Sequence, residues 1–418
     1  MPSRNSRKTR RPPRSQSTKA KKPATANNAT QKVRASGPVL FDKWSPTTSV
    51  EKKVSDLLHC TLTPDVEELP DCPWSDSVAL DPKHRPQVPD EPSGTVRREW
   101  CRYPQEAHLL DLAAWRYRRL TPDEVSIIQG FDPQWFHVPG VSTRNRMRAT
   151  GDAVPPPLAR AIMRSIDSCW DWSQKTALEI CSGCGGLASG ARDLPGFEHL
   201  ALVEYWSHAC EILRHQKPWS PDRVFHANVR EFDFAPYRDK VGLLSGGPPC
   251  QPWSLAGRHL GVSDPRDLLG SIHEVVEAVR PEVFVFENVP GLAGDQNRVY
   301  LMNVLQRLRK PGSQGLRYGV IAGILNAADF GVPQIRRRLF LIGFRDQPSS
   351  FAYSVFDRIH RAATHRDPTV PDRKRRPWVT LAEAFRNLPE PTGWRKWVSV
   401  DAIQRLSSKT AKRGTAKS

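Results

Sequence analysis

The feature that most constrains the fold is an alternation of strand-like and helix-like segments over residues 176–344. Short apolar runs such as 177–181, 199–204 and 282–286 each end in glycine or polar residues. Between such runs lie stretches such as 267–279, whose leucine, isoleucine and valine residues share one helical face. Alternating strands and helices predict a mostly parallel, doubly wound α/β sheet, which binds ligands beyond the carboxyl ends of its strands.

One predicted strand, 241–245, runs directly into Gly-Gly-Pro-Pro-Cys at 246–250. Glycine permits a sharp backbone bend and proline cannot continue a ladder, so a stiff turn should follow the strand. Cys250 would then lie at a strand tip on the ligand-binding edge of the sheet. We therefore treat its thiol as a candidate nucleophile.

Charged residues are expected at two further strand tips. Glu287 directly follows the apolar run at 282–286, and Arg336 and Arg338 stand on one side of the extended segment before the last strand. A carboxylate that faces a cleft needs a partner or a task, because its desolvation is costly. Two arginines can orient a carboxylate, a phosphate or a base. Each feature alone is common in proteins without a catalytic centre, but together with Cys250 they predict an active site.

A glycine-rich turn at 183–186 follows the first strand and precedes a helix. Small residues let the backbone approach a ligand, and the N–H groups at a helix N-terminus can bind it. The spacing is not that of a dinucleotide-binding fingerprint, so a purely structural turn stays open as an alternative. Glu204 ends the next strand, where it can accept hydrogen bonds from ribose hydroxyls, and Asn228 follows the third strand, near an expected adenine edge. Together they indicate a pocket for a nucleoside cofactor.

The positive charge of the chain is concentrated at its N-terminus. The 418 residues carry a net charge of +18, and residues 1–38 contain eleven lysines and arginines and no acid. We expect this segment to be disordered and to act as a nuclear localisation signal, an organelle transit peptide or a non-specific nucleic-acid contact. The remaining charge, about +7, still favours a polyanionic partner.

The eight cysteines lack the spacing of a disulfide framework, which favours a reducing compartment. Cys181 and Cys184 form a C-x-x-C without a second pair, so we expect no metal site. No apolar run reaches the length of a membrane span, and no apolar segment follows the basic start, so we expect no membrane association and no secretion. We predict a nuclear protein if the source is eukaryotic, and otherwise one of the cytoplasm or nucleoid.

Taken in order, these strand-tip motifs resemble those of the DNA cytosine-5 methyltransferase family. The resemblance covers residues 176–344 and implies an α/β, Rossmann-like S-adenosylmethionine-dependent methyltransferase fold, with a small irregular DNA-recognition region added to it. It is carried by Gly-Gly-Pro-Pro-Cys-Gln-Pro at 246–252, Asp-Pro-Arg at 264–266, Glu-Asn-Val at 287–289, Asn-Ala-Ala-Asp-Phe-Gly-Val-Pro at 326–333 and Gln-x-Arg-x-Arg at 334–338.

Residues 119–167 resemble the blocks that close such enzymes, but here they precede the cofactor turn. The resemblance therefore implies a circularly permuted order, which requires that the usual termini lie close together and that the new ends fall in exposed loops. The matching stretches are Leu-Thr-Pro-x-Glu at 120–124, Gln-Gly-Phe at 129–131 and Gly-Asp-Ala-Val-Pro at 151–155. Thr121 followed by Pro122 also predicts the start of a helix, and we expect a loop before Thr150. We expect the alternation of strands and helices to fade after Phe344. We predict a basic tail at 1–38, part of the target-recognition region at 39–118, the closing motifs at 119–167, the catalytic domain at 168–344, and the rest of the target-recognition region with a basic tail at 345–418.

The resemblance also implies a reaction, in which a methyl group passes from S-adenosyl-L-methionine to C5 of a cytosine flipped out of double-stranded DNA. Cys250 would form a covalent adduct at C6, Glu287 would contact N3, and Arg338 with Arg336 would anchor the base and Glu287. The protein would act as a monomer on DNA, in restriction–modification or in epigenetic methylation. The implied cofactor contacts are Gly183, Cys184, Gly185, Gly186, Leu187, Glu204, Tyr205, Asn228, Val229, Pro249, Leu269, Asp152, Ala153 and Val154.

Three positions depart from the usual pattern of the family. Cys181 stands where an aromatic residue stacks on adenine, so Tyr205 or a nearby tryptophan would have to replace it. Asn228 replaces an acid, and Asp152 replaces an asparagine. Two alternatives stay open: an RNA cytosine-5 methyltransferase, although a Cys-Phe-Thr segment is not found after the arginines, and a catalytically inactive or regulatory DNA-binding protein on the same scaffold.

Overall fold

The structure, a computed structural model, describes residues 39–40, 60–61, 87–98, 107–111, 116–249, 267–312, 315–389, 392–396 and 398–399. Its centre is an eight-stranded sheet with the order β1-β10-β11-β9-β8-β5-β6-β7. The strands β7, β6, β5, β8 and β9 are mutually parallel, with the first strand of the series in the middle, as in doubly wound nucleotide-binding folds. Their bounds are β5 Thr176–Ile180, β6 Glu198–Glu204, β7 Val224–His226, β8 Leu243–Gly246 and β9 Val283–Asn288.

The other half of the sheet contains one reversed strand. β11 (Arg337–Arg345) is antiparallel to both of its neighbours, β9 and β10 (Tyr318–Asn326), and β1 (Val39–Leu40) pairs in parallel with β10 at the edge. The predicted mostly parallel, doubly wound sheet is therefore confirmed.

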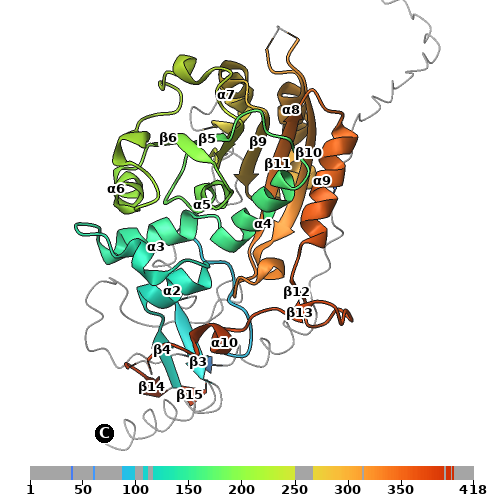
Figure 1. Cartoon of the computed structure of the whole chain (residues 1–418). Coiled ribbons are helices and arrows are strands. Elements are labelled where there is room, and N and C mark those ends of the chain that lie inside the picture. Colours follow the sequence, from blue (N-terminus) through green and yellow to red (C-terminus); the bar gives the residue numbers. More distant parts are fainter. Residues whose placement is uncertain are drawn as a thin grey trace, which may run out of the picture. The chain divides into compact units, whose positions relative to one another are not determined.

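Helices cover both faces of this sheet (Figure 1). Successive residues of β9 point to opposite sides: Phe284 and Phe286 join a core that includes α7 and α8, whereas Val283 and Val285 join a core that includes α4 and α9. This two-residue period is what a strand buried on both faces requires. The covering helices are α4 Pro156–Asp167, α5 Ala188–Arg192, α6 Ser207–His215, α7 Ile272–Val279, α8 Arg298–Arg309 and α9 Ser349–Arg361.

Two of the helices contradict the sequence-based expectation. The stretch before Thr150 was expected to be a loop, but α3 (Thr143–Asp152) occupies it, capped by the side chain of Ser142. The pattern was expected to fade after Phe344, but α9 follows. Few apolar residues mark α3, and it is held by packing of Met147 and Ala149 against other segments. By contrast, the apolar positions of α9 recur at helical spacing and were overlooked: Ala352, Val355, Phe356 and Ile359.

A second, smaller region combines segments that precede most of the large sheet in the sequence with segments that follow it. β4 (Arg116–Arg119) lies between β3 (His108–Asp111) and β14 (Arg395–Lys396), and β2 (Cys60–Thr61) pairs with β15 (Val398–Ser399). These pairings join parts of the segments 39–118 and 345–418, although the domain boundaries themselves stay a prediction. The remaining helices and strands are α2 Pro122–Ile128, α10 Leu381–Phe385, β12 His365–Arg366, β13 Arg376–Pro377, and the 3-10 helices η2 Pro133–Phe136, η3 Pro221–Arg223, η4 Ala235–Tyr237, η6 Leu269–Ser271, η7 Pro290–Ala293, η8 Asp295–Asn297 and η9 Ala327–Phe330.

The predicted helix start at Thr121 is confirmed. Its side chain accepts from the backbone N–H of Glu124, the Glu124 carboxylate accepts from the backbone N–H of Thr121, and Pro122 is the first helical residue. α2 and α10 share a small core with Val96 and Leu109. In the part of the chain that the structure describes, no helix has the length and apolar character of a membrane span.

Candidate active site

Glu287 and Arg338 form an ion pair across two neighbouring strands. Glu287 lies near the end of β9 and Arg338 near the start of β11, and Nε of Arg338 is 2.8 Å from Oε1 of Glu287. Only 13% of the Glu287 side chain and 14% of the Arg338 side chain are exposed. In such partial burial the charge on each side chain offsets the desolvation cost of the other, so both side chains are held in place.

The same carboxylate lies beside the segment that leads into Cys250. A Cβ atom added to Gly247 would lie 3.6 Å from Oε2 of Glu287. The side-chain amide of Asn288 donates to the carbonyl of Pro248 over 2.8 Å. These contacts bring the Glu-Asn and Gly-Pro-Pro motifs together. Cys250 itself lies outside the described residues.

Arg336 occupies a different environment from Arg338, although only one residue separates them. Its side chain is buried, with Nη1 donating to the carbonyl of Val96 over 2.6 Å and Nη2 to the carbonyl of Gly151 over 2.9 Å. Gln334 beside it accepts from the backbone N–H of Val96 and donates to Oε1 of Gln129. We call Gln129, Gln334 and Arg336 the junction cluster. It ties the arginine segment to 93–98 and to the closing motifs.

The closing motifs pack directly on the glycine-rich turn. Gln129 of the junction cluster donates to the carbonyl of Ala153. A Cβ atom at Gly186 would lie only 2.1 Å from the carbonyl oxygen of Val154. The thiol of Cys184, in the turn, lies 3.5 Å from the carbonyl oxygen of Ala149. Residues 119–167 are therefore part of the same structural unit as the cofactor turn.

The glycines of this turn differ in what surrounds them. Gly183 has φ +54°, and a Cβ atom there would meet nothing within 4 Å. A Cβ atom at Gly185 would lie 2.6 Å from the Trp219 ring, and one at Gly186 would lie 2.1 Å from the carbonyl oxygen of Val154. Gly185 and Gly186 are thus required for packing, whereas Gly183 faces open space.

Glu204 at the tip of β6 holds the turn and the next helix together. Its Oε2 accepts from the backbone N–H of Gly183 over 2.8 Å, and its Oε1 accepts from that of Trp206 over 2.7 Å. Each carboxylate oxygen can accept a further hydrogen bond. Tyr205 is 74% exposed, and the Trp206 ring lies under the guanidinium groups of Arg98 and Arg148. Trp206 is therefore the more enclosed of the two aromatic residues at this tip.

Asp152, the last residue of α3, pairs with Arg98. Nη1 of Arg98 is 2.7 Å from its Oδ2. Burial raises the pKa of Asp152 to about 6, an effect that Arg98, Arg336 and Arg148 partly oppose and Glu204 reinforces. Arg98 had no counterpart among the residues singled out from the sequence, because it stands in a stretch without periodicity.

The other predicted cofactor residues surround this region in two ways. Asn228 is half-buried, and its side chain donates to Glu231 and accepts from the backbone N–H of Arg230. The carbonyl of Pro249 accepts from the backbone N–H groups of Leu268 and Leu269, which fixes the end of the Gly-Pro-Pro segment to η6. The predicted cofactor residues whose side chains are buried in the core are Ala153, Val154, Cys184, Leu187, Val229 and Leu269.

Glu179, in the middle of the sheet, is a buried acid for which the sequence indicated no role. Oγ of Ser245, on the strand that leads to Cys250, donates to its Oε2 over 2.8 Å. Burial raises the pKa of Glu179 to about 8, so it is protonated at neutral pH. Burial also raises the pKa of the Cys181 and Cys184 thiols, which disfavours the thiolate form that metals bind. Within the described ranges, no cluster of three or more His, Cys, Asp or Glu residues is placed to hold a metal ion.

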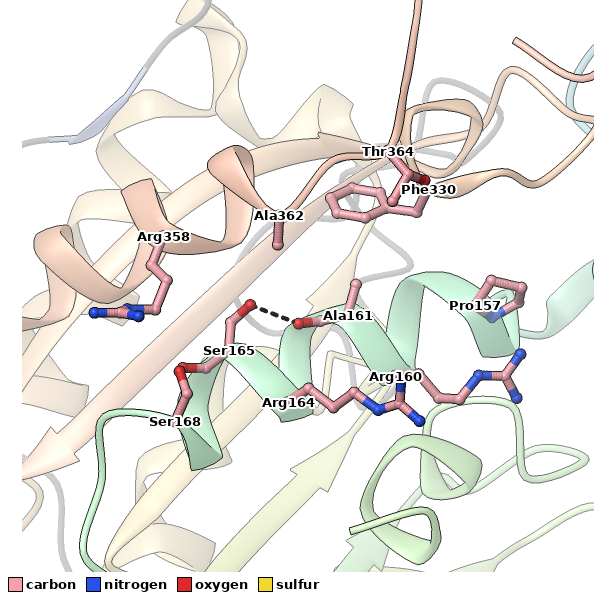
Figure 2. Close-up of a pocket in the computed structure, with 10 residues that line it drawn as sticks. All are labelled: Pro157, Arg160, Ala161, Arg164, Ser165, Ser168, Phe330, Arg358, Ala362 and Thr364. Atoms are coloured by element: carbon pink, nitrogen blue, oxygen red, sulfur yellow. Dashed lines mark hydrogen bonds between the residues drawn. The ribbon is translucent and has the colours of Figure 1, made fainter. Parts of the chain in front are cut away.

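A groove of about 450 Å³ lies away from these residues, between α4, α9 and η9. Figure 2 shows Arg160, Arg164 and Arg358 along it, with Ser165 donating within α4 to the carbonyl of Ala161. Nη1 of Arg160 lies 3.3 Å from a carboxylate oxygen of Asp193. No predicted site residue lines this groove, so the candidate active site is defined by the strand tips instead.

The fold and the strand tips define a class: a doubly wound α/β protein with a glycine-rich turn after its first central strand, an acid at the tip of the next strand, and a charged pair at two further strand tips. The family model described as C-5 cytosine-specific DNA methylase matches residues 19–168 and 176–413. The chain belongs to the C-5 cytosine-specific DNA methylase family, and its fold is a Rossmann-like methyltransferase fold. The resemblance found in the motifs is thereby confirmed, whereas their permuted order stays a prediction.

Similarity to individual proteins supports the same family. The chain is 36% identical over 179 residues to the type II methyltransferase M.NgoMIV of Neisseria gonorrhoeae, covering 43% of this chain and 54% of that protein. It is 30% identical over 233 residues to the type II methyltransferase M.AquIA of a Picosynechococcus strain, covering 52% of this chain and 91% of that protein. The matches thus span about half the length of M.NgoMIV and most of M.AquIA.

Among solved structures, a prophage-encoded protein of E. coli described as a DNA modification methyltransferase aligns with a TM-score of 0.36 and 24% identity, covering 52% of this chain and 56% of that chain.

Proposed function

We propose that this protein transfers a methyl group from S-adenosyl-L-methionine to C5 of cytosine in double-stranded DNA, through a covalent adduct between Cys250 and C6 of a flipped base. One observation carries the proposal within this family: the Glu287–Arg338 pair lies directly beside the Gly-Pro-Pro segment that leads to Cys250. The description of the family model supports DNA as the substrate, and the type II methyltransferase names of the relatives support a role in restriction–modification. We infer action as a monomer on DNA, in the nucleus of a eukaryote or otherwise in the cytoplasm or nucleoid.

The charged pair suits the chemistry of this reaction. Attack of a thiolate on C6 places negative charge on the pyrimidine ring, and a group that donates a proton or hydrogen bond to N3 stabilises that charge. In this proposal the carboxyl group of Glu287 contacts N3. Arg338 positions Glu287 through the 2.8 Å ion pair, while its remaining N–H groups can reach the base. A flipped base then meets both residues at one strand edge.

The residues around the glycine turn fit S-adenosyl-L-methionine, which supplies an activated methyl group when bound. Gly183 leaves open space at the turn, because a Cβ atom there would meet nothing within 4 Å. Glu204 keeps free acceptor capacity for ribose hydroxyls after binding the two backbone N–H groups. Trp206, whose backbone N–H donates to Glu204, has an aromatic ring at the tip of β6, and we infer that it compensates for the aromatic residue that Cys181 replaces.

The permuted order of the motifs is part of the same proposal. The closing motifs at 119–167 contact the glycine turn through Val154 and the arginine segment through Gly151. Since these contacts join segments irrespective of their order in the chain, a protein whose closing motifs come first can form the same site. The pairing of β4 with β14 likewise supports a target-recognition region assembled from both ends of the chain.

Covalent trapping tests the proposed function. DNA that contains 5-fluorocytosine cannot lose its C5 substituent, so the purified protein should form a complex stable to denaturing electrophoresis that requires S-adenosyl-L-methionine. Cys250→Ser should abolish the complex, while Cys169→Ser, at a half-buried cysteine in another part of the fold, should leave it intact. A complex that survives in Cys250→Ser would refute the nucleophile. Methyl transfer to tRNA without transfer to DNA would support the RNA alternative. DNA binding without any methyl transfer would support the regulatory alternative.

A further inference from the structure

Arg98 and Asp152 form a pair of opposite charges beside the cofactor turn. Nη1 of Arg98 lies 2.7 Å from Oδ2 of Asp152, with 43% and 31% of the two side chains exposed. Among the described residues, no other hydrogen bond of the Arg98 guanidinium or of Oδ1 of Asp152 is found. Arg98 therefore keeps N–H donors, and Asp152 keeps an acceptor oxygen, that can bind a third group.

The backbone holds this pair in a fixed position. A Cβ atom at Gly151 would lie 2.4 Å from the carbonyl oxygen of Arg97 and 2.7 Å from the backbone nitrogen of Arg98, so the two segments are in direct contact. Arg336 of the junction cluster donates to the carbonyl of Gly151, next to Asp152. A pre-positioned arginine loses less freedom when it binds a ligand than a solvated one does.

The pair also faces the cofactor region. The Arg98 guanidinium lies 5.8 Å from the centroid of the Trp206 ring, and Trp206 donates its backbone N–H to Glu204. The charge of Glu204 helps to raise the pKa of Asp152, which indicates that the two carboxylates act on each other across this region. Two neighbouring carboxylates favour a cationic ligand. S-adenosyl-L-methionine has a net positive charge, because it carries a sulfonium and an ammonium group but only one carboxylate.

We propose that Arg98 and Asp152 form the subsite for the amino-acid end of S-adenosyl-L-methionine. Arg98 binds the α-carboxylate of the ligand, and Asp152 binds its α-ammonium group. The subsite rests on the proposed function, because it presupposes this cofactor. It also gives a reason for the replacement of asparagine by Asp152: a carboxylate serves both the ammonium group and the arginine that the segment 93–98 brings to it.

Equilibrium binding of three ligands to the full chain tests this assignment. The ligands are S-adenosyl-L-methionine, its decarboxylated form, which lacks the α-carboxylate, and 5′-methylthioadenosine, which lacks the whole amino-acid end. We expect decarboxylation to weaken binding to the unmodified protein by about 10- to 100-fold, the range of a charged hydrogen bond. Arg98→Ala should lower the affinity for S-adenosyl-L-methionine by a similar factor. It should bind the decarboxylated form as tightly as the unmodified protein does.

The remaining variants separate a specific contact from general charge. Arg148→Ala removes a second guanidinium over the same Trp206 ring and should change the affinity for S-adenosyl-L-methionine by less than about threefold. Asp152→Asn should lower the affinity for both ligands that carry the ammonium group. Its affinity for 5′-methylthioadenosine should equal that of the unmodified protein.

Two results would overturn the subsite while leaving the proposed function intact: equal losses for both charged ligands in Arg98→Ala, or no loss at all. If the unmodified protein binds none of the three ligands, the cofactor assignment and the proposed function fail together. Should Arg98→Ala not fold, Arg98→Lys and the ligand series on the unmodified protein still decide the question.

Discussion

Arg336 and Arg338 stand on the same segment but serve two different regions of the molecule. Arg338 belongs to the strand tips, where it pairs with the partly exposed Glu287. Arg336 belongs to the junction cluster, where its guanidinium is buried and bound to the carbonyls of Val96 and Gly151. The comparison teaches that the arginine motif has two parts: one arginine pairs with Glu287 at the strand tips, and the other holds together segments that are distant in the sequence.

The largest expected effect comes from removing the buried arginine. Arg336→Met leaves two buried carbonyls without donors and should lower the free energy of unfolding by about 3–5 kcal/mol. Chemical denaturation followed by tryptophan fluorescence measures the loss. A variant within about 1 kcal/mol of the unmodified protein would contradict a structural role for Arg336.

The second prediction concerns the acid behind the strand tips. Because burial raises the pKa of Glu179 from 4.5 to about 8, the folded protein binds this proton more tightly than the unfolded chain. The free energy of unfolding should therefore fall as pH rises between these two values. Relative to Glu179→Gln, the unmodified protein should lose about 2–3 kcal/mol between about pH 5 and about pH 7. Denaturation curves recorded across this pH range give the free energy of unfolding of both proteins. Equal changes in the two proteins would refute a protonated Glu179.

Substitution by lysine compares the two arginines directly. Arg338→Lys keeps the charge beside Glu287 but loses the planar donors, so methyl transfer should fall by about 10²-fold while the melting temperature changes little. Arg336→Lys is the matched control, and it should lower the melting temperature more than Arg338→Lys, since one ammonium group cannot replace both hydrogen bonds. Initial rates and thermal melts of both proteins check the contrast. Equal melting losses at the two positions would remove the distinction between them.

The smallest effect is expected at the glycine turn. Gly183→Ala must adopt φ +54° but meets nothing within 4 Å, so it should cost about 1 kcal/mol of stability and weaken cofactor binding. Gly186→Ala has ordinary backbone angles but collides with the carbonyl of Val154, and it should lose more stability. Thermal melts with and without S-adenosyl-L-methionine distinguish the two. A larger loss of stability in Gly183→Ala than in Gly186→Ala would contradict the packing of Val154, in the closing motifs, against Gly186.

Much of the catalytic region was predictable from local sequence. Strand tips at Glu204, Glu287 and Asn228 follow apolar runs of strand length, and the carboxyl ends of parallel strands meet at one edge. The capping box at Thr121 was equally local. α3 was missed because its stability comes from contacts with distant segments, and Arg98 because no periodicity marks its stretch.

The sequence by itself determined the doubly wound sheet, the family and the chemical types at the strand tips, because these depend on residues close together in the chain. Tertiary structure alone decided which arginine pairs with Glu287, which glycine faces open space and which segment supplies Arg98 to Asp152. The physical reason is that alternation along a strand fixes only the side to which a residue points. Whether a guanidinium there meets a carboxylate or two carbonyls depends on segments such as 93–98 that pack beside it from far away in the sequence.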